Sequence, residues 1–164
     1  MTPDAAAADE AAHARALLAR MHGSWAGTAR LWLQPGVLAG EDAVMGTVDG
    51  FHGGRWTRHE YETTIDGKRE TGTALLGFQL IGRLWQVAWL DTWHTGSSIM
   101  FFEGAFEPDA GALAVLGSYP DVEGPPWGWR TSFEPGDDTL LVRHYNVTPA
   151  GDEALAVEFD YRRV

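Results

Sequence analysis

The chain of 164 residues contains no cysteine, which excludes both disulfide bonds and metal sites built from thiolates. Its longest apolar stretches are far shorter than the roughly 20 residues that a transmembrane helix requires. A secretory pattern is also missing, because Asp4, Asp9 and Glu10 stand where a basic segment and an apolar run would be. We therefore expect a cytoplasmic protein with no membrane partner.

Basic residues are scarce. Lysine and arginine number 12 against 23 aspartates and glutamates, so the formal net charge is −11. The adjacent basic pairs are Lys68-Arg69 and Arg162-Arg163, and neither forms a larger cluster. A field of this sign repels a phosphate backbone, so we expect no nucleic-acid partner.

Aromatic residues and turn formers are what the chain has in abundance. Aromatics make up 12% of the residues and include eight tryptophans, while twenty glycines and eight prolines are spread along the sequence. This spacing favours many short strands joined by turns. The length fits one domain with one core, which we place over residues 1–164.

The beginning of the chain reads as a helix over residues 3–22. Thr2 suits the N-cap, Pro3 the first helical position, and Gly23 the stop. Alanines fill its first half, so the sizeable apolar side chains belong to the last turns: Leu17, Leu18 and Met21. We expect this helix to cap one end of the fold.

Beyond Gly23 the apolar pattern changes from helical to alternating, and turn residues divide it into about ten segments. The predicted strands are 24–33, 43–51, 55–64, 71–81, 84–94, 97–106, 111–119, 127–134, 138–147 and 153–163. Consecutive strands without helices between them predict an antiparallel meander, and closure would remove its edges. The predicted fold is therefore all-β: a closed, antiparallel, up-and-down barrel over residues 23–164.

Alternation assigns side chains to the two faces of each strand. His59 and Tyr61 are expected inside, as is the row Leu155, Val157, Phe159 and Tyr161. In 84–94 the inward row is Trp85, Val87, Trp89, Asp91 and Trp93, opposite the outward row Gln86, Thr92 and His94. Segments 97–106 and 138–147 carry apolar residues on both faces, which favours cover by a second subunit in a homodimer.

Asp91 stands out in this assignment. A carboxylate on an aromatic interior face costs several kcal/mol unless it is paired or protonated. We therefore predict that Asp91 is buried and hydrogen-bonded to a side chain of another strand. The candidate partners, of which Tyr61 and His59 are the first choices, are His59, Tyr61, Arg143, His144 and Tyr145.

Several segments resemble a known family. Gly23-Ser24-Trp25, which follows the helix, resembles the opening of lipocalins and other calycins. The resemblance implies that Trp25 lies at a closed barrel end under an arginine of the last strand, Arg162 or Arg163. Further stretches in the same order are similar to the bacterial lipocalin-like proteins of domain-of-unknown-function family 1579: 75–78, 88–91, 102–106 and 159–163. This likeness, from about residue 10 onward, implies a fold and supplies no catalytic positions.

Three functions remain open. The first is binding of a small apolar or aromatic molecule in a barrel cavity, with the predicted ligand-binding residues His59, Tyr61, Trp89, Asp91, Trp129 and Tyr145. The second is an enzyme in which Asp91 and His59 perform acid–base chemistry on such a molecule. The third is a structural or interaction protein whose barrel is filled.

Two further expectations concern the surroundings of this site. No His-x-His pair or Glu-x-x-His run is present to accompany His59 and His144, so we expect no metal, no haem and no other cofactor. The proline-rich stretch 119–129 contains two tryptophans, and we expect it to form a lid over the open end of the barrel.

Overall fold

The computed structural model describes residues 5–164. Its helix, α1, spans Ala5–Arg20 and is followed by a single turn, in which the N–H of Met21 bonds the carbonyl of Leu18. The expected N-cap Thr2 and first residue Pro3 lie outside the described residues. No helix within residues 5–164 combines the length and the apolar character needed to cross a membrane.

Ten strands follow in the described part of the chain. They are β1 (Gly23–Gln34), β2 (Val37–Phe51), β3 (Trp56–Ile65), β4 (Lys68–Gln79), β5 (Leu84–Asp91), β6 (Met100–Ala105), β7 (Leu113–Tyr119), β8 (Trp127–Pro135), β9 (Thr139–Val147) and β10 (Glu153–Arg163). Each strand pairs antiparallel with its sequence neighbours, and β10 pairs with β1. The predicted closed, antiparallel, up-and-down barrel is thereby confirmed.

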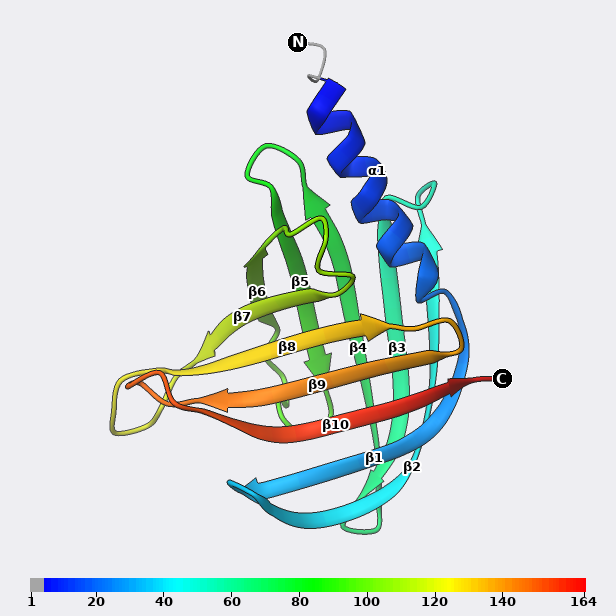
Figure 1. Cartoon of the computed structure of the whole chain (residues 1–164). Helices are drawn as coiled ribbons and strands as arrows, with labels where there is room; N and C mark the ends of the chain where they lie inside the picture. The colour runs from blue at the N-terminus through cyan, green and yellow to red at the C-terminus, as the bar shows by residue number, and fades with distance from the viewer. Residues whose placement is uncertain (1–4) are drawn as a thin grey trace.

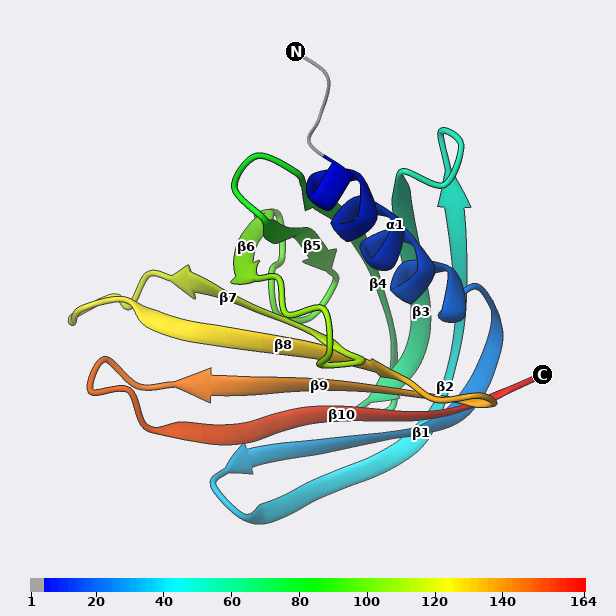
Figure 2. The same ribbon diagram turned by 45° about the horizontal axis from the view of Figure 1, so that its top comes forward.

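Figure 1 shows how the barrel is flattened into two layers, in which β1 and β7–β10 run across β3–β6. The same crossing is seen after rotation, with α1 at the end of the barrel near the start of β3 (Figure 2). Tight connections follow the turn chemistry of the sequence: Asp66 and Gly67, which join β3 to β4, both have positive φ, as a two-residue hairpin turn of type I′ requires.

The closed end of the barrel is built around Trp25, which is 1% exposed. Its indole N–H donates to the carbonyl of Met21 at 2.8 Å, and the guanidinium of Arg163 lies 4.3 Å from the ring centroid. Arg163 also donates to the carbonyl of His22, which ties the last strand to the end of α1. The helix therefore caps this end as predicted, and Arg163 rather than Arg162 covers the tryptophan.

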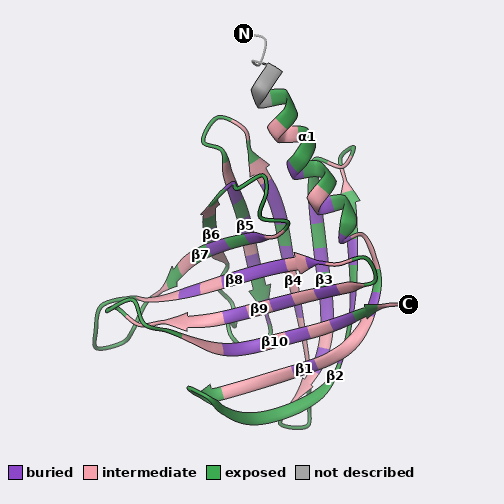
Figure 3. Ribbon diagram, viewed as in Figure 1, coloured by how far each residue is buried: buried purple, intermediate pink, exposed green. Residues whose placement is uncertain are grey.

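Side chains fill the barrel behind this cap. Figure 3 shows buried positions alternating with more exposed ones along the strands. The inward assignments in β3 and β5 are confirmed, because each of these side chains is at most 7% exposed: His59, Tyr61, Trp85, Val87, Trp89 and Asp91. In β6 the inward side chain is Phe102, whereas Phe101 is 71% exposed.

Two departures from strict alternation correct the sequence prediction. A bulge in β10 between Leu155 and Val157 places two residues opposite one on β9, so Ala156 is buried in place of Leu155. At the other site β5 ends at Asp91 instead of residue 94, and β6 begins at Met100 instead of residue 97. Trp93 therefore lies in a turn and not on the inward row of a strand.

Candidate functional site

The end of the barrel opposite α1 is hollowed into three adjoining pockets, two of which contain residues predicted for the site. The first, which we call the aromatic pocket, has a volume of about 310 Å³, and its walls include Trp89, Trp93, His94, Met100, Tyr119 and Trp129. The second, which we call the acidic pocket, has a volume of about 160 Å³, and its walls include Arg30, Glu41, Asp42, Asp66, Glu70 and Asp91. Leu31, Leu33 and His94 line both, so the two pockets share a wall.

The floor of the aromatic pocket is a stack of rings. Trp89 and Trp129 lie nearly parallel, with centroids 5.9 Å apart and an interplanar angle of 8°. His144 stacks on Trp89 at 5.2 Å and accepts a hydrogen bond on Nδ1 from the indole N–H of Trp129. Thr131 bonds the same nitrogen, so the floor is held by hydrogen bonds as well as by packing.

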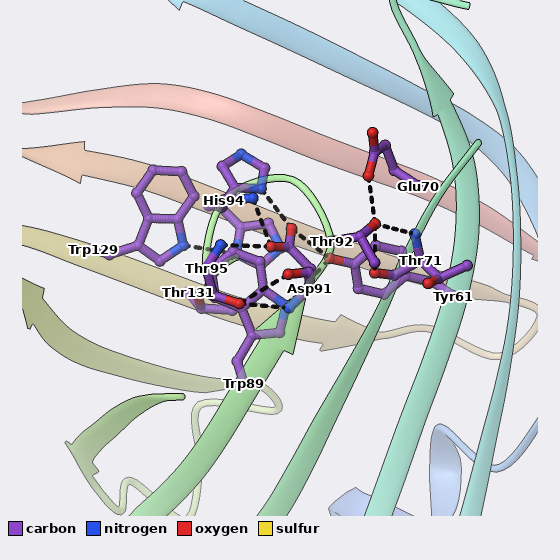
Figure 4. Close-up of polar contacts among 11 residues, drawn as sticks. Tyr61, Glu70, Thr71, Trp89, Asp91, Thr92, His94, Thr95, Trp129 and Thr131 are labelled. Atoms are coloured by element: carbon purple, nitrogen blue, oxygen red, sulfur yellow. Dashed lines mark hydrogen bonds and ion pairs between the residues drawn. The ribbon is translucent and has the colours of Figure 1, made fainter. Parts of the chain in front are cut away.

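Asp91, at the end of β5, lines the acidic pocket, and its carboxylate takes part in four hydrogen bonds (Figure 4). Its Oδ1 accepts from the backbone N–H groups of His94, at 2.6 Å, and Thr95, at 2.8 Å. Its Oδ2 lies 2.6 Å from Nδ1 of His94 and accepts from the hydroxyl of Tyr61 at 3.3 Å. The prediction of a buried Asp91 bonded to a side chain from another strand is confirmed, with Tyr61 as that partner.

The charge state of Asp91 follows from these contacts. Burial by itself would raise the pKa of its carboxyl, but the hydrogen bond and charge of His94 and the two backbone donors outweigh burial and lower it. The ionised carboxylate can only accept hydrogen bonds, so Nδ1 of His94 carries the hydrogen between them. Within residues 5–164 the other ring nitrogen of His94, Nε2, has no hydrogen-bond partner.

Tyr61 links Asp91 to the aromatic floor. Its hydroxyl donates to Asp91 and accepts from the indole N–H of Trp89 at 3.2 Å. Burial and the charge of Asp91 raise the pKa of Tyr61 well above its ordinary value, so it stays protonated. Its ring fits because Gly72 stands opposite it on β4, where a Cβ atom would come within 2.2 Å of the ring.

Two of the residues predicted for the site are not brought to it. His59 lies deeper in the barrel, where it bonds the hydroxyl of Tyr161 at 3.2 Å, and burial lowers its pKa to about 4. It lines neither pocket. Tyr145 lies on the outer face of β9, where the guanidinium of Arg130 is 3.9 Å from its ring centroid. The side chain of Arg143 also lies outside the site and pairs with Glu134 and Glu158.

Sequence reasoning also placed His94 wrongly. Strict alternation assigned it to the outer face, but the strand ends at Asp91 and the following turn folds the ring back over the carboxylate. A local signal could have predicted this turn, because aspartate often accepts hydrogen bonds from backbone N–H groups a few residues later. Here Asp91 accepts from the N–H groups of His94 and Thr95, three and four residues later, and the strand ends. Thr95 closes this turn from the other side by bonding the backbone of Asp91.

The predicted lid also needs correction. Trp127 and Trp129 belong to strand β8, and the remaining loop, residues 120–126, lines a neighbouring pocket of about 500 Å³ instead of the aromatic pocket. Of the stretch 119–129, Tyr119 at the end of β7 and Trp129 line the aromatic pocket. Across residues 5–164, no group of three or more His, Cys, Asp and Glu side chains is placed to hold a metal ion.

The sequence of the chain matches a known protein family. The model of the family described as "Protein of unknown function (DUF1579)" matches residues 10–163, which include α1 from Glu10 onward and every strand of the barrel. No curated protein matches the chain. Because the match extends over nearly the whole sequence, the chain belongs to the DUF1579 family.

Proposed function

We propose that this protein binds a small apolar or aromatic molecule in the aromatic pocket. The observation that carries the proposal is a cavity of about 310 Å³ at the open end of the barrel, walled by tryptophans and by one accessible polar ring. Ligand sites in proteins are typically concave, mostly apolar and supplied with few polar groups, and their volumes begin near this size. The cavity has room for one compact molecule.

The pocket at the barrel mouth is a better site than the barrel interior. The void enclosed among His59, Tyr61, Trp89 and their neighbours measures about 10 Å³. A space of that size holds about one water molecule at most. A ligand would therefore rest on Trp89 and Trp129, above the filled half of the barrel.

The largest hollow lies elsewhere, on the outer surface over β4–β8, and measures about 930 Å³. It is a groove open to solvent, in which Phe101 is 71% and Leu116 is 51% exposed. Such a surface covers little of a small ligand, so it is less suited to holding one than the mouth pocket. Exposed apolar side chains in this groove could be covered by a second subunit. The homodimer and the structural or interaction function therefore stay predictions.

The enzyme alternative paired Asp91 with His59. The described hydrogen bonds of Asp91 go to Tyr61, His94 and Thr95, while that of His59 goes to Tyr161. Because the two proposed catalytic groups do not contact each other, the geometry favours binding over acid–base chemistry by this pair. The polar groups that a ligand could contact therefore lie at the barrel mouth and not around His59.

The experiment is a titration with N-phenyl-1-naphthylamine, an uncharged dye whose emission rises in apolar surroundings. We expect saturable binding that Trp93→Ala weakens by about tenfold, the usual effect of losing an aromatic contact. Trp127→Ala is the matched control, because Trp127 is also half-buried but lines the outer groove and the neighbouring pocket, and not the aromatic pocket. Absence of saturable binding, or a larger effect of Trp127→Ala, would contradict the proposal.

A further inference from the structure

We infer that the ligand of the aromatic pocket carries an O–H or N–H donor and no negative charge, and that its donor bonds Nε2 of His94. This inference rests on the proposed function, since it specifies the chemistry of the molecule in the same pocket. Three properties of His94 and its surroundings carry it: the state of its two nitrogens, its fixed orientation, and the charges beside it.

The first property is that His94 offers an acceptor. Its Nδ1–H is engaged by Asp91 at 2.6 Å, so in the neutral form of the ring it is Nε2 that carries the lone pair and no hydrogen. The side chain is 21% exposed and lines both pockets, so the ring can be reached from the barrel mouth. Figure 4 shows the ring above Asp91, with one nitrogen turned toward the carboxylate and the other away from it.

The second property is that the ring is held in place before any ligand arrives. Trp93 meets it edge to face, with centroids 4.2 Å apart, and Trp89 and Trp129 lie at 5.4 Å and 5.3 Å. Together with the bond to Asp91, these contacts fix the direction in which Nε2 points. A fixed acceptor beside an aromatic floor binds a donor without a further loss of side-chain freedom.

The third property is the charge of the adjoining acidic pocket. Its walls carry five carboxylates, from Glu41, Asp42, Asp66, Glu70 and Asp91, against the single guanidinium of Arg30. Arg30 is itself bonded to Glu41 and to Glu158, so its charge is already compensated. Together with a net charge of −11 for the chain, this field disfavours an anionic ligand. Phenols, alcohols and amines with an aromatic or apolar body remain.

A matched set of probes tests this inference: 2-naphthol, 2-methoxynaphthalene and 2-naphthoate, titrated by calorimetry at neutral pH. The three share one ring system but present a donor, no donor and a negative charge. We expect 2-naphthol to bind about tenfold more tightly than 2-methoxynaphthalene, the effect of one hydrogen bond. We expect 2-naphthoate to bind the least tightly of the three.

The variant His94→Asn removes Nε2 and leaves an amide N–H near the place of Nδ1, where it can still bond Asp91. We expect both probes to lose whatever the ring of His94 contributes by packing, and the affinities for 2-naphthol and 2-methoxynaphthalene to come within about twofold of each other. Equal binding of these two by the unaltered protein, a preference that survives in His94→Asn, or tightest binding of 2-naphthoate would each overturn the inference. If His94→Asn fails to fold, the relative affinities of the three probes for the unaltered protein decide whether the inference holds. Binding of none of the three would overturn the proposed function itself, and the inference with it.

Discussion

The Nδ1 atom of His94 lies 2.6 Å from Oδ2 of Asp91, and the backbone nitrogen of the same histidine lies 2.6 Å from Oδ1. One carboxylate therefore sets both the turn that ends β5 and the orientation of the ring that this turn presents. The arrangement explains why an acidic residue occupies an inward row of tryptophans. Asp91 is fully hydrogen-bonded without a ligand, and it acts on the aromatic pocket through His94.

We predict that Asp91→Asn lowers the free energy of unfolding by about 1–3 kcal/mol, the cost of leaving buried donors unpaired. The amide of asparagine has only one accepting oxygen. Its NH₂ group therefore faces either the two backbone N–H groups or the side chains of His94 and Tyr61, and that pair loses its acceptor. Urea denaturation measures the change. The control is Asp109→Asn in an exposed loop, which we expect to stay within about 0.5 kcal/mol of the unaltered protein. Equal stabilities of the two variants would contradict the account.

Gly72 supplies a second test, because its missing side chain makes room for Tyr61. We predict that Gly72→Ala destabilises the protein by about 1–3 kcal/mol through overpacking against the tyrosine ring. Gly40→Ala is the matched control on β2, where an added Cβ meets nothing within 4 Å. That variant should be neutral or slightly stabilising. A Gly72→Ala protein as stable as Gly40→Ala would show that the Tyr61 ring is not confined in this way.

The cap at the closed end is tested by Trp25→Ala. Because Trp25 is 1% exposed and packs under Arg163, we predict a loss of about 3–5 kcal/mol, the usual cost of truncating a buried tryptophan. Trp56→Ala, at a position that is 43% exposed, should cost less than half as much. The denaturant midpoints of the two variants give the comparison. A midpoint for Trp25→Ala that equals that of the unaltered protein would refute the assigned role.

Stability should fall when the solution becomes acidic. Burial lowers the pKa of His59 to about 4 and, with the charge of His94 as a lesser cause, that of His144 to about 3, so both rings are neutral in the folded protein. As the pH decreases from about 6.5, the unfolded chain binds protons that the folded protein does not. Each of these histidines then lowers the free energy of unfolding by up to about 1.4 kcal/mol per pH unit. The partly buried His22, whose pKa burial also lowers, adds in the same direction.

Urea denaturation between about pH 7 and pH 5 measures this slope. We expect His144→Gln to reduce it and His52→Gln, at an exposed position in the β2–β3 turn, to leave it unchanged. A stability that does not depend on pH over this interval would contradict the neutral, buried state of the two histidines.

The fold could be predicted because alternation along the strands is set by the backbone itself. His59, Tyr61, Trp89 and Asp91 lie inside for this reason, and the run of turns predicts the meander. Prediction failed where a side chain or a bulge overrides the alternation. The bulge before Val157 is not visible in a row of apolar residues.

The site was harder to predict than the fold. His94 changes face because the carboxylate of Asp91 competes for the backbone N–H groups that would have continued the strand. Tyr145 and His144 are neighbours on a strand with apolar residues on both faces, so alternation could not decide which of them lies inside. The structure places His144 in the aromatic floor and Tyr145 outside.

The eight tryptophans report where a ligand sits, because they are divided among the regions of the molecule. Trp32, Trp89, Trp93 and Trp129 line the aromatic pocket, Trp56 and Trp127 line the outer groove, Trp25 lies at the closed end, and Trp85 is buried in the core. Each indole N–H gives its own signal in a ¹H–¹⁵N NMR spectrum, and single Trp→Phe variants assign the signals.

The most direct test of the central claim is to add 2-naphthol to ¹⁵N-labelled protein and follow these indole signals. A ligand in the aromatic pocket should shift the signals of Trp32, Trp89, Trp93 and Trp129 with concentration, and leave those of Trp25, Trp56, Trp85 and Trp127 unmoved. Shifts confined to Trp56 and Trp127 would place the ligand in the outer groove, and a spectrum without shifts would show that no such ligand binds. Either result would contradict a binding site at the mouth of the barrel.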